Sequence, residues 1–463
     1  MGEKRTGRMA KSRLGRAAKL GGLAAGHAAR EARTRTRTLG KDDDAKQHAI
    51  GEAHLETARR LVRVLGTMRG AAMKLGQTLS VIDVGVVPES HRAQVQAELA
   101  KLQHMAPTVS FAQMRRVIEE DLGGPLAEFF AEFHEEPIGA ASIGQVYRAV
   151  LPDGREVAVK VQYPGIADVV RADMKNMGMA LKLASKLMPG FDSREIADEV
   201  SERISEELDY ELEASNHKAM AREYRDHPFF VVPDVVSSLC RERVIVTEFV
   251  HGRKFTDVVH DDDAARDRWG EILFRFYVNA PLRSKLLNGD PHPGNAIFLD
   301  DGRVAFLDFG FFKRQTQSEI DVQLELLRAV YARDADTLYD ITVREGIITG
   351  GREMVQPLLE KYDAVTWWFM RDEDVTLQPD TVTKVVLEQA EMEKEGFGRI
   401  TLPADHLVTL RAFGLVLGIL GQLRATNNWF RIGREVIFDE APVTELGRIE
   451  AGDAVPDADG ATA

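Results

Sequence analysis

The chain has 463 residues, a length that the usual domain size divides into about three units. Its net charge of −13 argues against a nucleic-acid-binding protein, and its hydrophobic content of 44% is ordinary for a globular protein with a buried core. The single cysteine, Cys240, excludes an intramolecular disulfide and fits a reducing compartment such as the cytoplasm.

The first forty residues are basic, unlike the chain as a whole. Their acids are Glu3 and Glu31 alone, and leucines such as Leu14 and Leu20 lie among many lysines and arginines. A basic helix with a weakly apolar face suits the surface of an anionic membrane, whereas a solvated, disordered tail is the plainer alternative. The longest apolar run, 412–421, is too short to cross a bilayer, so we expect a buried helix there and membrane contact that is at most peripheral.

The predicted elements begin with helices over 54–103 and 111–122, and a Gly-Gly-Pro sequence ends the second. A β-rich stretch follows over 137–162, where Asp153-Gly154 between two apolar runs predicts a hairpin. Helices are predicted again over 168–225.

Strand-like sequence returns over 231–250. From Asp261 onward helices dominate, interrupted by short strands at 296–298 and 304–307. The small, acidic stretch from Ala451 predicts a disordered tail.

The segment Gly139-Ala140-Ala141-Ser142-Ile143-Gly144-Gln145-Val146 has the register of the kinase phosphate loop, G-x-G-x-x-G-x-V. Glycines in such a loop let backbone N–H groups approach phosphate oxygens closely. Ala141 replaces the second glycine, and its methyl group is expected to stiffen the loop. On its own the match is weak, because turns rich in Gly and Ala are common. The candidate nucleotide-binding residues here are Gly139, Ala140, Ala141, Ser142, Gly144 and Val146.

Three further motifs follow in the order found in kinases. Val157-Ala158-Val159-Lys160 matches the V-A-I-K strand, whose lysine neutralises phosphate charge, although alone it fits a surface lysine equally well. Asn295 lies five residues after Asp290, as in the kinase catalytic loop, and Leu307-Asp308-Phe309-Gly310 supplies the D-F-G turn. The ordered set predicts an ATP site, with Lys160 and Asp290 as catalytic residues and Asn295 and Asp308 as oxygen ligands of Mg²⁺.

A kinase site also needs a carboxylate that holds the lysine. An acidic helix offers Glu207 and then Glu213, and the residue order does not separate them. Glu248 and Val250 fall in the expected link between two lobes, where backbone groups would meet adenine. His292, between two prolines, is interpreted as shaping its loop rather than as a metal ligand or base.

Together these motifs resemble the UbiB family, the AarF-domain or ADCK atypical kinases, over most of the chain. The matching segments are 74–77 (K-x-G-Q), 157–165 (V-A-V-K-V-Q-x-P-G), 207–214 (E-x-D-Y-x-x-E-A) and 290–295 (D-P-H-P-G-N). The resemblance implies an α+β, bilobal protein-kinase-like fold with a helical K-x-G-Q extension packed over the cleft. Lys74 and Gln77 would then point toward the nucleotide, whereas the alternative is that Gly76 only permits close helix packing.

The resemblance also implies a domain order and cofactors. The expected parts are a basic N-terminal extension (1–53), a helical K-x-G-Q region (54–110), an N-lobe (111–250), a C-lobe (251–448) and a disordered tail (449–463). ATP and Mg²⁺ would be the cofactors, and the activity would support isoprenoid-quinone or related lipid metabolism.

The chain departs from the family pattern at three places. Gly139 stands first in the loop where alanine is usual, which is expected to relax the loop. Asn288-Gly289 replaces the usual His-Ala before Asp290, and His104 stands where Asp is common. These departures leave the expectation of ATP binding intact and bear on turnover and substrate.

Three functions are compatible with these residues. The first is an atypical ATPase or kinase that transfers phosphate to water or to a small or lipid substrate. The second is a protein kinase acting in trans; against it, no A-P-E motif follows Gly310, and 316–333 is predicted to be helical at once, so a peptide platform is missing. The third is a nucleotide-gated scaffold of a biosynthetic complex, which the retained Lys160, Asp290, Asn295 and Asp308 disfavour.

Overall fold

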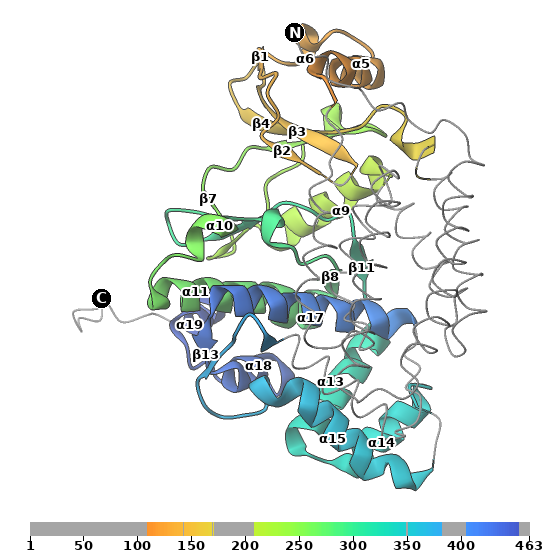
Figure 1. The fold of residues 1–463 in the computed structure, drawn as a ribbon, viewed down its shortest axis with the longest axis vertical. Coiled ribbons are helices and arrows are strands. Elements are labelled where there is room, and N and C mark those ends of the chain that lie inside the picture. Colours follow the sequence, from red (N-terminus) through yellow and green to blue (C-terminus); the bar gives the residue numbers. More distant parts are fainter. Residues whose placement is uncertain are drawn as a thin grey trace, which may run out of the picture. The chain divides into compact units, whose positions relative to one another are not determined.

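The computed structural model describes residues 109–141, 143–168, 170, 208–348, 351–381 and 404–452 (Figure 1). The expected extension (1–53) and nearly all of the expected K-x-G-Q region lie outside these residues, as do Lys74, Gln77, Ser142 and Glu207. The chain divides into two compact units, which are described separately. The first comprises residues up to Glu211 and Val236–Thr247, and the second comprises Leu212–Val235 and residues from Glu248 onward. Residues 212–235, expected in the N-lobe, therefore cluster with the second unit.

The first unit contains a five-stranded sheet. Its strands are β1 (Glu132–Phe133), β2 (Gly139–Ala140), β3 (Gly144–Val150), β4 (Glu156–Gln162) and β6 (Val244–Glu248), in the order β1-β3-β4-β6 with β2 also paired to β3. Strands β3 and β4 form the predicted antiparallel hairpin, with register from Gly144↔Gln162 to Val150↔Glu156. Gly154 in the turn has φ +87°, a left-handed conformation that glycine adopts without strain. The hairpin prediction is confirmed.

Helix α5 (Phe111–Leu122) confirms the predicted helix of the first unit, and the short helix α6 (Leu126–Phe129) follows it. The residues of α5 that face the interior recur at helical spacing: Met114, Val117, Ile118 and Leu122 are buried. Gly123 ends the helix with φ +82°, and its N–H donates to the carbonyl oxygen of Glu119 at 3.0 Å.

The second unit contains a four-stranded sheet and a separate two-stranded ribbon. The sheet has the order β5-β10-β9-β7, formed by β5 (Phe230–Val231), β10 (Val304–Phe306), β9 (Ala296–Phe298) and β7 (Arg253–Lys254). The ribbon pairs β8 (Leu286–Asn288) with β11 (Phe312–Arg314), antiparallel. The predicted strands at 296–298 and 304–307 are confirmed, whereas the predicted strand region 231–250 also contains the 3₁₀ turn η1 (Ser237–Leu239).

Helices make up most of the second unit. Helix α9 (Tyr210–Glu223) begins with Tyr210 and Glu211, which belong to the first unit, and continues in the second. The other helices and turns in the described part of this unit are α10 (Phe255–Val258), α11 (Asp263–Phe274), the π turn η2 (Arg275–Asn279), α12 (Ala280–Ser284), η3 (Pro293–Asn295), α13 (Gln317–Ala332), α14 (Ala335–Arg344), η4 (Arg352–Met354), α15 (Val355–Thr366), η5 (Trp367–Phe369), α17 (Ala404–Leu423), α18 (Trp429–Ile437) and α19 (Glu445–Ala451). Strands β12 (Val375–Thr376) and β13 (Thr426–Asn427) pair with each other.

Helix α17 is the apolar helix that the sequence predicts to be buried. It lies alongside α11 (Figure 1), and Ala412, Val416 and Leu420 are buried in the unit's core. Among the residues that the structure describes, no helix combines the length and the apolar character that crossing a bilayer requires.

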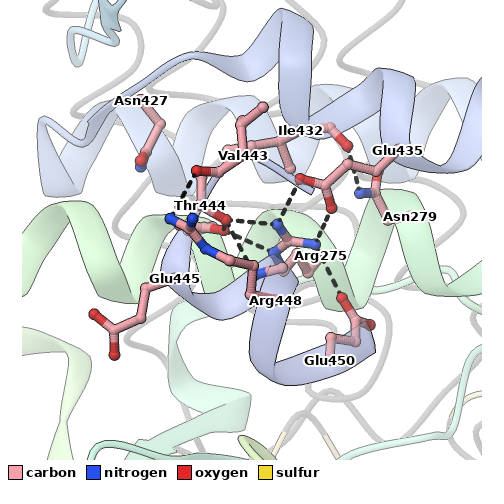
Figure 2. A network of polar contacts seen from close by, with 12 residues as sticks. Arg275, Asn279, Asn427, Ile432, Glu435, Val443, Thr444, Glu445, Arg448 and Glu450 are labelled. Atoms are coloured by element: carbon pink, nitrogen blue, oxygen red, sulfur yellow. Dashed lines mark hydrogen bonds and ion pairs between the residues drawn. The ribbon is translucent and has the colours of Figure 1, made fainter. Parts of the chain in front are cut away.

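A buried cluster of charges fixes the end of the described chain. Arg275, 1% exposed, donates to Glu435 at 2.7 Å, to Glu450 at 2.9 Å and to Thr444 at 2.9 Å (Figure 2), and it also pairs with Glu271 at 2.8 Å. Glu450 belongs to α19, which runs through Ala451. Residues 449–451 are therefore helical, although the sequence assigned them to a disordered tail, because a buried arginine on η2 holds this helix in place.

Candidate nucleotide and magnesium site

The expected phosphate loop forms a tight hairpin at the edge of the first unit's sheet. Gly139 pairs with Val146 and Ala140 with Gln145, and the N–H of Ala141 donates to the carbonyl oxygen of Gly144 at 2.9 Å. The two glycines of the loop have different surroundings. A Cβ at Gly139 would meet no atom within 4 Å, whereas a Cβ at Gly144 would overlap the carbonyl oxygen of Val161. Gly144 is thus required by close strand packing, and Gly139 is not.

Lys160 lies on β4 opposite Val146, so the lysine and the end of the loop are neighbours in the hairpin. The Lys160 side chain is half-buried, and its Nζ lies 5.2 Å from the centroid of the Tyr210 ring. Two residues further along β4, buried Gln162 donates from Nε2 to the carbonyl oxygens of Leu208 at 2.8 Å and Glu242 at 3.3 Å. Gln162 therefore ties the start of α9 to this strand.

In the second unit, Asn288 joins the Asp290 loop to the Asp308 turn. Its Nδ2 donates to the carbonyl oxygen of Asp308 at 2.9 Å, and its Oδ1 accepts from the N–H of Asp290 at 3.1 Å. Asn288 is 3% exposed, so both bonds are shielded from water. One amide thereby fixes the backbone of the two carboxylate-bearing residues relative to each other.

The loop that carries Asn295 is shaped by His292. The N–H of Gly294 donates to His292 Nδ1 at 3.0 Å, and the N–H of Asn295 donates to the His292 carbonyl oxygen at 2.9 Å. The N–H of Leu307 donates to the carbonyl oxygen of Asn295 at 2.9 Å, which brings Asn295 next to the residue that precedes Asp308. These bonds support the loop-shaping interpretation of His292.

The Asp308-Phe309-Gly310 turn packs against helix α9. The Asp308 carboxylate accepts from the N–H of Gly310 at 3.0 Å. A Cβ built on Gly310 would lie 3.3 Å from Asp308 Oδ1 and 3.5 Å from Glu213 Oε2, so both carboxylates border the space that this glycine leaves. Glu213 is 4% exposed. Two carboxylates that border one space repel each other, and a bound cation would relieve this repulsion.

Residues of α9 contact the Asp308-Phe309-Gly310 turn, and a tyrosine of η2 lies within range of its negative charge. Asn216 Nδ2 donates to the Phe309 carbonyl oxygen at 3.5 Å, and the His217 ring meets the Phe309 ring edge-on at 4.9 Å between centroids. Burial, and after it the negative charges of Asp290 and Asp308, raise the pKa of Tyr277. The Tyr277 hydroxyl therefore stays protonated, and it lies in the negative potential of Asp290 and Asp308.

The donor set fits Mg²⁺. Asn295 and Asp308 offer the hard oxygen atoms that this ion prefers, and phosphate and water oxygens complete its octahedron in nucleotide sites. Within the described residues no group of three or more His, Cys, Asp or Glu side chains is arranged to hold a metal alone.

Residues 101–342 match the family model of the ABC1 atypical kinase-like domain. The chain belongs to this family. The UbiB resemblance and the kinase-like fold that the sequence predicts are thereby confirmed.

Several ABC1 kinases resemble the chain over most of its length. The atypical kinase coq-8, mitochondrial, of Caenorhabditis elegans is 29% identical over 86% of this chain and 54% of its own length. The atypical kinase COQ8B, mitochondrial, of Rattus norvegicus is 31% identical over 73% of this chain and 64% of its own. The chloroplastic Arabidopsis thaliana protein ACTIVITY OF BC1 COMPLEX KINASE 1 is 32% identical over 66% of this chain and 45% of its own length. The chain thus spans about half to two thirds of these relatives.

A solved structure of similar fold is that of Rv3197 from Mycobacterium tuberculosis, which was determined in complex with erythromycin. It is 31% identical in sequence, covers 82% of this chain and 96% of its own, and superimposes with a TM-score of 0.57.

Two of the three family departures lie within the described residues, whereas His104 lies outside them. Gly289, where alanine is usual in ABC1 kinases, lies against the ring of Phe311, and a Cβ there would overlap that ring. The N–H of Gly289 also donates to the carbonyl oxygen of Phe311 at 2.9 Å. Gly139 lies in open space, so its exchange for alanine is sterically neutral. The relaxation of the loop by this glycine stays a prediction.

The expected adenine segment begins at the end of β6. The N–H of Glu248 donates to the carbonyl oxygen of Asp234 at 2.9 Å, and Glu248 Oε2 accepts from the N–H of Asp234 at 3.3 Å. The backbone N–H and the carboxylate of Glu248 are therefore both bonded to the backbone of Asp234.

Sequence reasoning missed Asn288, Gln162, Tyr210 and Tyr277 as residues of the site. Asn288 was noticed only as a departure, and Tyr210 only as part of a family motif. Each is recognised only by its interaction with a residue that is distant in sequence, and the order of residues along the chain does not reveal such interactions. Lys160 and the loop lie in the first unit, and Asp290, Asn295, Asp308 and Glu213 lie in the second.

Proposed function

We propose that this chain binds ATP with Mg²⁺ and transfers the terminal phosphoryl group to water or to a small or lipid acceptor. The observation that carries this proposal is the pair of bonds made by Asn288, which hold the Asp290 loop and the Asp308 turn in a fixed relation. Phosphoryl transfer depends on such positioning more than on covalent chemistry by the protein.

The proposed roles follow from the chemistry of each side chain. Asp290 would orient the attacking hydroxyl or water and take its proton. Asn295 and Asp308 would hold Mg²⁺, which when bound neutralises charge on the phosphate oxygens. Lys160 would neutralise the α- and β-phosphates, with the loop Gly139–Val146 over them.

The acid that pairs with Lys160 is proposed to be Glu213, with Glu207 as the alternative. Glu213 is buried and borders the Asp308 turn, which carries one of the proposed Mg²⁺ ligands. Glu207 lies outside the described residues. Charge reversal at each position would show which acid pairs with Lys160. Glu213→Lys is expected to abolish nucleotide binding, whereas Glu207→Lys is expected to leave it intact.

A small acceptor is favoured over a protein acceptor by the chain that follows the D-F-G turn. Only residues 311–316 separate Gly310 from helix α13, and β11 takes half of them. The helix begins at once because Thr316 and Glu319 form a capping box, in which Glu319 N–H donates to Thr316 Oγ1 at 3.2 Å and Thr316 N–H to Glu319 Oε2 at 2.6 Å. This leaves no room for the long activation segment on which protein kinases lay their peptide substrates.

The finer proposal is that the activity supports isoprenoid-quinone or related lipid metabolism. It rests on the UbiB resemblance and on the similarity to the atypical kinases coq-8 and COQ8B. The erythromycin complex of the M. tuberculosis relative favours a second ligand class, bulky hydrophobic small molecules such as macrolides. Both classes share a large apolar surface.

Phosphate release from the purified protein tests the proposal. It is measured with Mg²⁺-ATP alone, with liposomes, with erythromycin and with casein as a generic protein acceptor, for the wild type, Asp290→Asn and Asp308→Asn. We expect Mg²⁺-dependent release that both substitutions abolish and that liposomes or the macrolide increase. Equal release by all three proteins would refute the proposed site, whereas transfer to casein would support the protein-kinase alternative. Lipid and metabolite profiles of cells carrying Asp308→Asn would then test the quinone link.

A further inference from the structure

Tyr210 presents its aromatic face to Lys160. The Lys160 Nζ lies 5.2 Å from the ring centroid, within the range in which an ammonium is attracted by the electron-rich face of an aromatic ring. Tyr210 is 1% exposed, so water does not compete for that face. The interaction lies wholly within the first unit.

The backbone of Tyr210 is held at the start of α9. The N–H of Tyr210 donates to the carbonyl oxygen of Glu242 at 3.4 Å. Gln162, which lies two residues from Lys160 on β4, binds the carbonyl oxygens of both Glu242 and Leu208. The strand that carries the lysine therefore also holds the turn that carries the tyrosine.

The hydroxyl edge of the same ring reaches the end of the phosphate loop. A Cβ at Gly144 would lie 3.0 Å from the Tyr210 hydroxyl oxygen. Any side chain at position 144 would therefore press on Tyr210 as well as on the Val161 carbonyl. One ring thus touches the lysine with its face and the last glycine of the loop with its edge.

We propose that Tyr210 is a positioning residue that holds the Lys160 ammonium beside the end of the phosphate loop. This inference rests on the proposed ATP binding. A free lysine side chain populates many rotamers, and restricting them before the nucleotide arrives lowers the entropy lost on binding. A purely structural role for Tyr210 would require an apolar ring of the right size and nothing more.

The two roles are separated by changing the charge distribution of the ring at constant shape. Tyr210→Phe keeps the face, Tyr210→Leu removes it, and mono-, di- and trifluorophenylalanine at position 210 weaken the face stepwise. The readout is Mg²⁺-ATP affinity by calorimetry, with the melting temperature as a folding control. We expect Tyr210→Phe to bind within about twofold of wild type, and affinity to fall with each fluorine to a total of about 5- to 30-fold.

Tyr147→Leu is the matched control. Tyr147 is also a buried tyrosine of the first unit, but its ring packs against Phe111 and Phe133 at 5.6 Å each. We expect this variant to melt at a lower temperature and to keep wild-type ATP affinity within about twofold, since it removes an aromatic ring without removing a cation–π contact. A loss of affinity equal to that of Tyr210→Leu would overturn the inference.

A second readout does not require ATP. Acetylation of Lys160 by acetic anhydride, followed by peptide mass spectrometry, is expected to be faster in Tyr210→Leu than in wild type, because the ring favours the protonated amine. If wild type fails to bind ATP, or Lys160→Ala binds it as wild type does, the proposed function fails. If Lys160→Ala loses affinity while the fluorinated series is flat and Lys160 reactivity is unchanged, only the role of Tyr210 is wrong.

Discussion

The side-chain amide of Asn288 donates to the backbone carbonyl oxygen of Asp308 at 2.9 Å while accepting from the N–H of Asp290 at 3.1 Å. These two bonds connect residues that come from different loops and that carry two of the carboxylates of the proposed site. Because Asn288 is buried, neither bond can be replaced readily by water.

Removing this amide should loosen the site more than it destabilises the fold. Asn288→Leu leaves a buried carbonyl and a buried N–H without their partner, at a cost of about 1–3 kcal/mol each. We expect a lower melting temperature and a larger relative loss in the stabilisation that Mg²⁺-ATP provides. The measurement is thermal unfolding with and without Mg²⁺-ATP. The prediction is wrong if the ligand-induced shift equals that of wild type.

Asp308 should be necessary for the magnesium dependence of nucleotide binding. Asp308→Asn removes one charged oxygen ligand and relieves the repulsion from Glu213, so the unliganded protein is expected to be at least as stable as wild type. The extra stabilisation that Mg²⁺ adds to ATP is expected to vanish. Thermal shifts with ATP plus EDTA and with ATP plus Mg²⁺ check this, and a retained difference between the two conditions would contradict it.

The two glycines of the phosphate loop provide a matched pair. Gly144→Ala places a methyl group onto the Val161 carbonyl oxygen and toward the Tyr210 hydroxyl, and we expect a loss of about 1–3 kcal/mol in unfolding free energy from overpacking. Gly139→Ala restores the residue usual in the family and meets open space, so we expect wild-type stability. Urea unfolding of both variants is the measurement. Equal destabilisation of the two would show that backbone freedom, not packing, is what these positions require.

Gly289 and Phe311 should behave as a coupled pair. Gly289→Ala drives a methyl group into the Phe311 ring, with an expected cost of about 1–3 kcal/mol. In a Phe311→Leu background the ring is gone, and the same substitution should be nearly neutral. A double-mutant cycle measured by urea unfolding gives the coupling energy, and additive effects would argue against the steric explanation.

The Arg275 cluster should make the second unit sensitive to acid. Burial raises the pKa of Glu450, but its contact with His227 and the charge of Arg275 outweigh burial, and the net pKa lies below the usual 4.5. A carboxylate whose pKa is lowered in the folded state stabilises that state above its unfolded pKa, and this contribution is lost as pH falls through the folded pKa.

Glu450→Gln is therefore expected to be less stable than wild type at pH 7, with a difference that shrinks as the pH falls below 4.5. Urea unfolding between pH 3 and 7 measures it. Glu445, an exposed acid at the first position of the same helix, provides the control variant Glu445→Gln, for which we expect a much smaller difference. A pH-independent deficit in Glu450→Gln would mean that lost packing, not charge, is responsible.

The sequence by itself determined the elements that depend on neighbouring residues. The hairpin around Asp153-Gly154, helix α5 with its Gly123 end and the abrupt start of α13 at Thr316 were predictable, because turn conformations, caps and apolar periodicity are encoded within a few residues. The sequence also predicted the candidate site residues Lys160, Asp290, Asn295 and Asp308, because each belongs to a short and continuous motif.

The tertiary structure alone decided which side chains act together. Glu213 lies beside Gly310, Asn288 bridges Asp290 and Asp308, and Tyr210 faces Lys160 across fifty residues of chain. It also decided that α19 is ordered, since the buried guanidinium of Arg275 reaches Glu450 from 175 residues away. Such contacts follow from how helices and strands pack, and packing depends on many side chains at once, whereas a sequence pattern records only the spacing of residues along one segment.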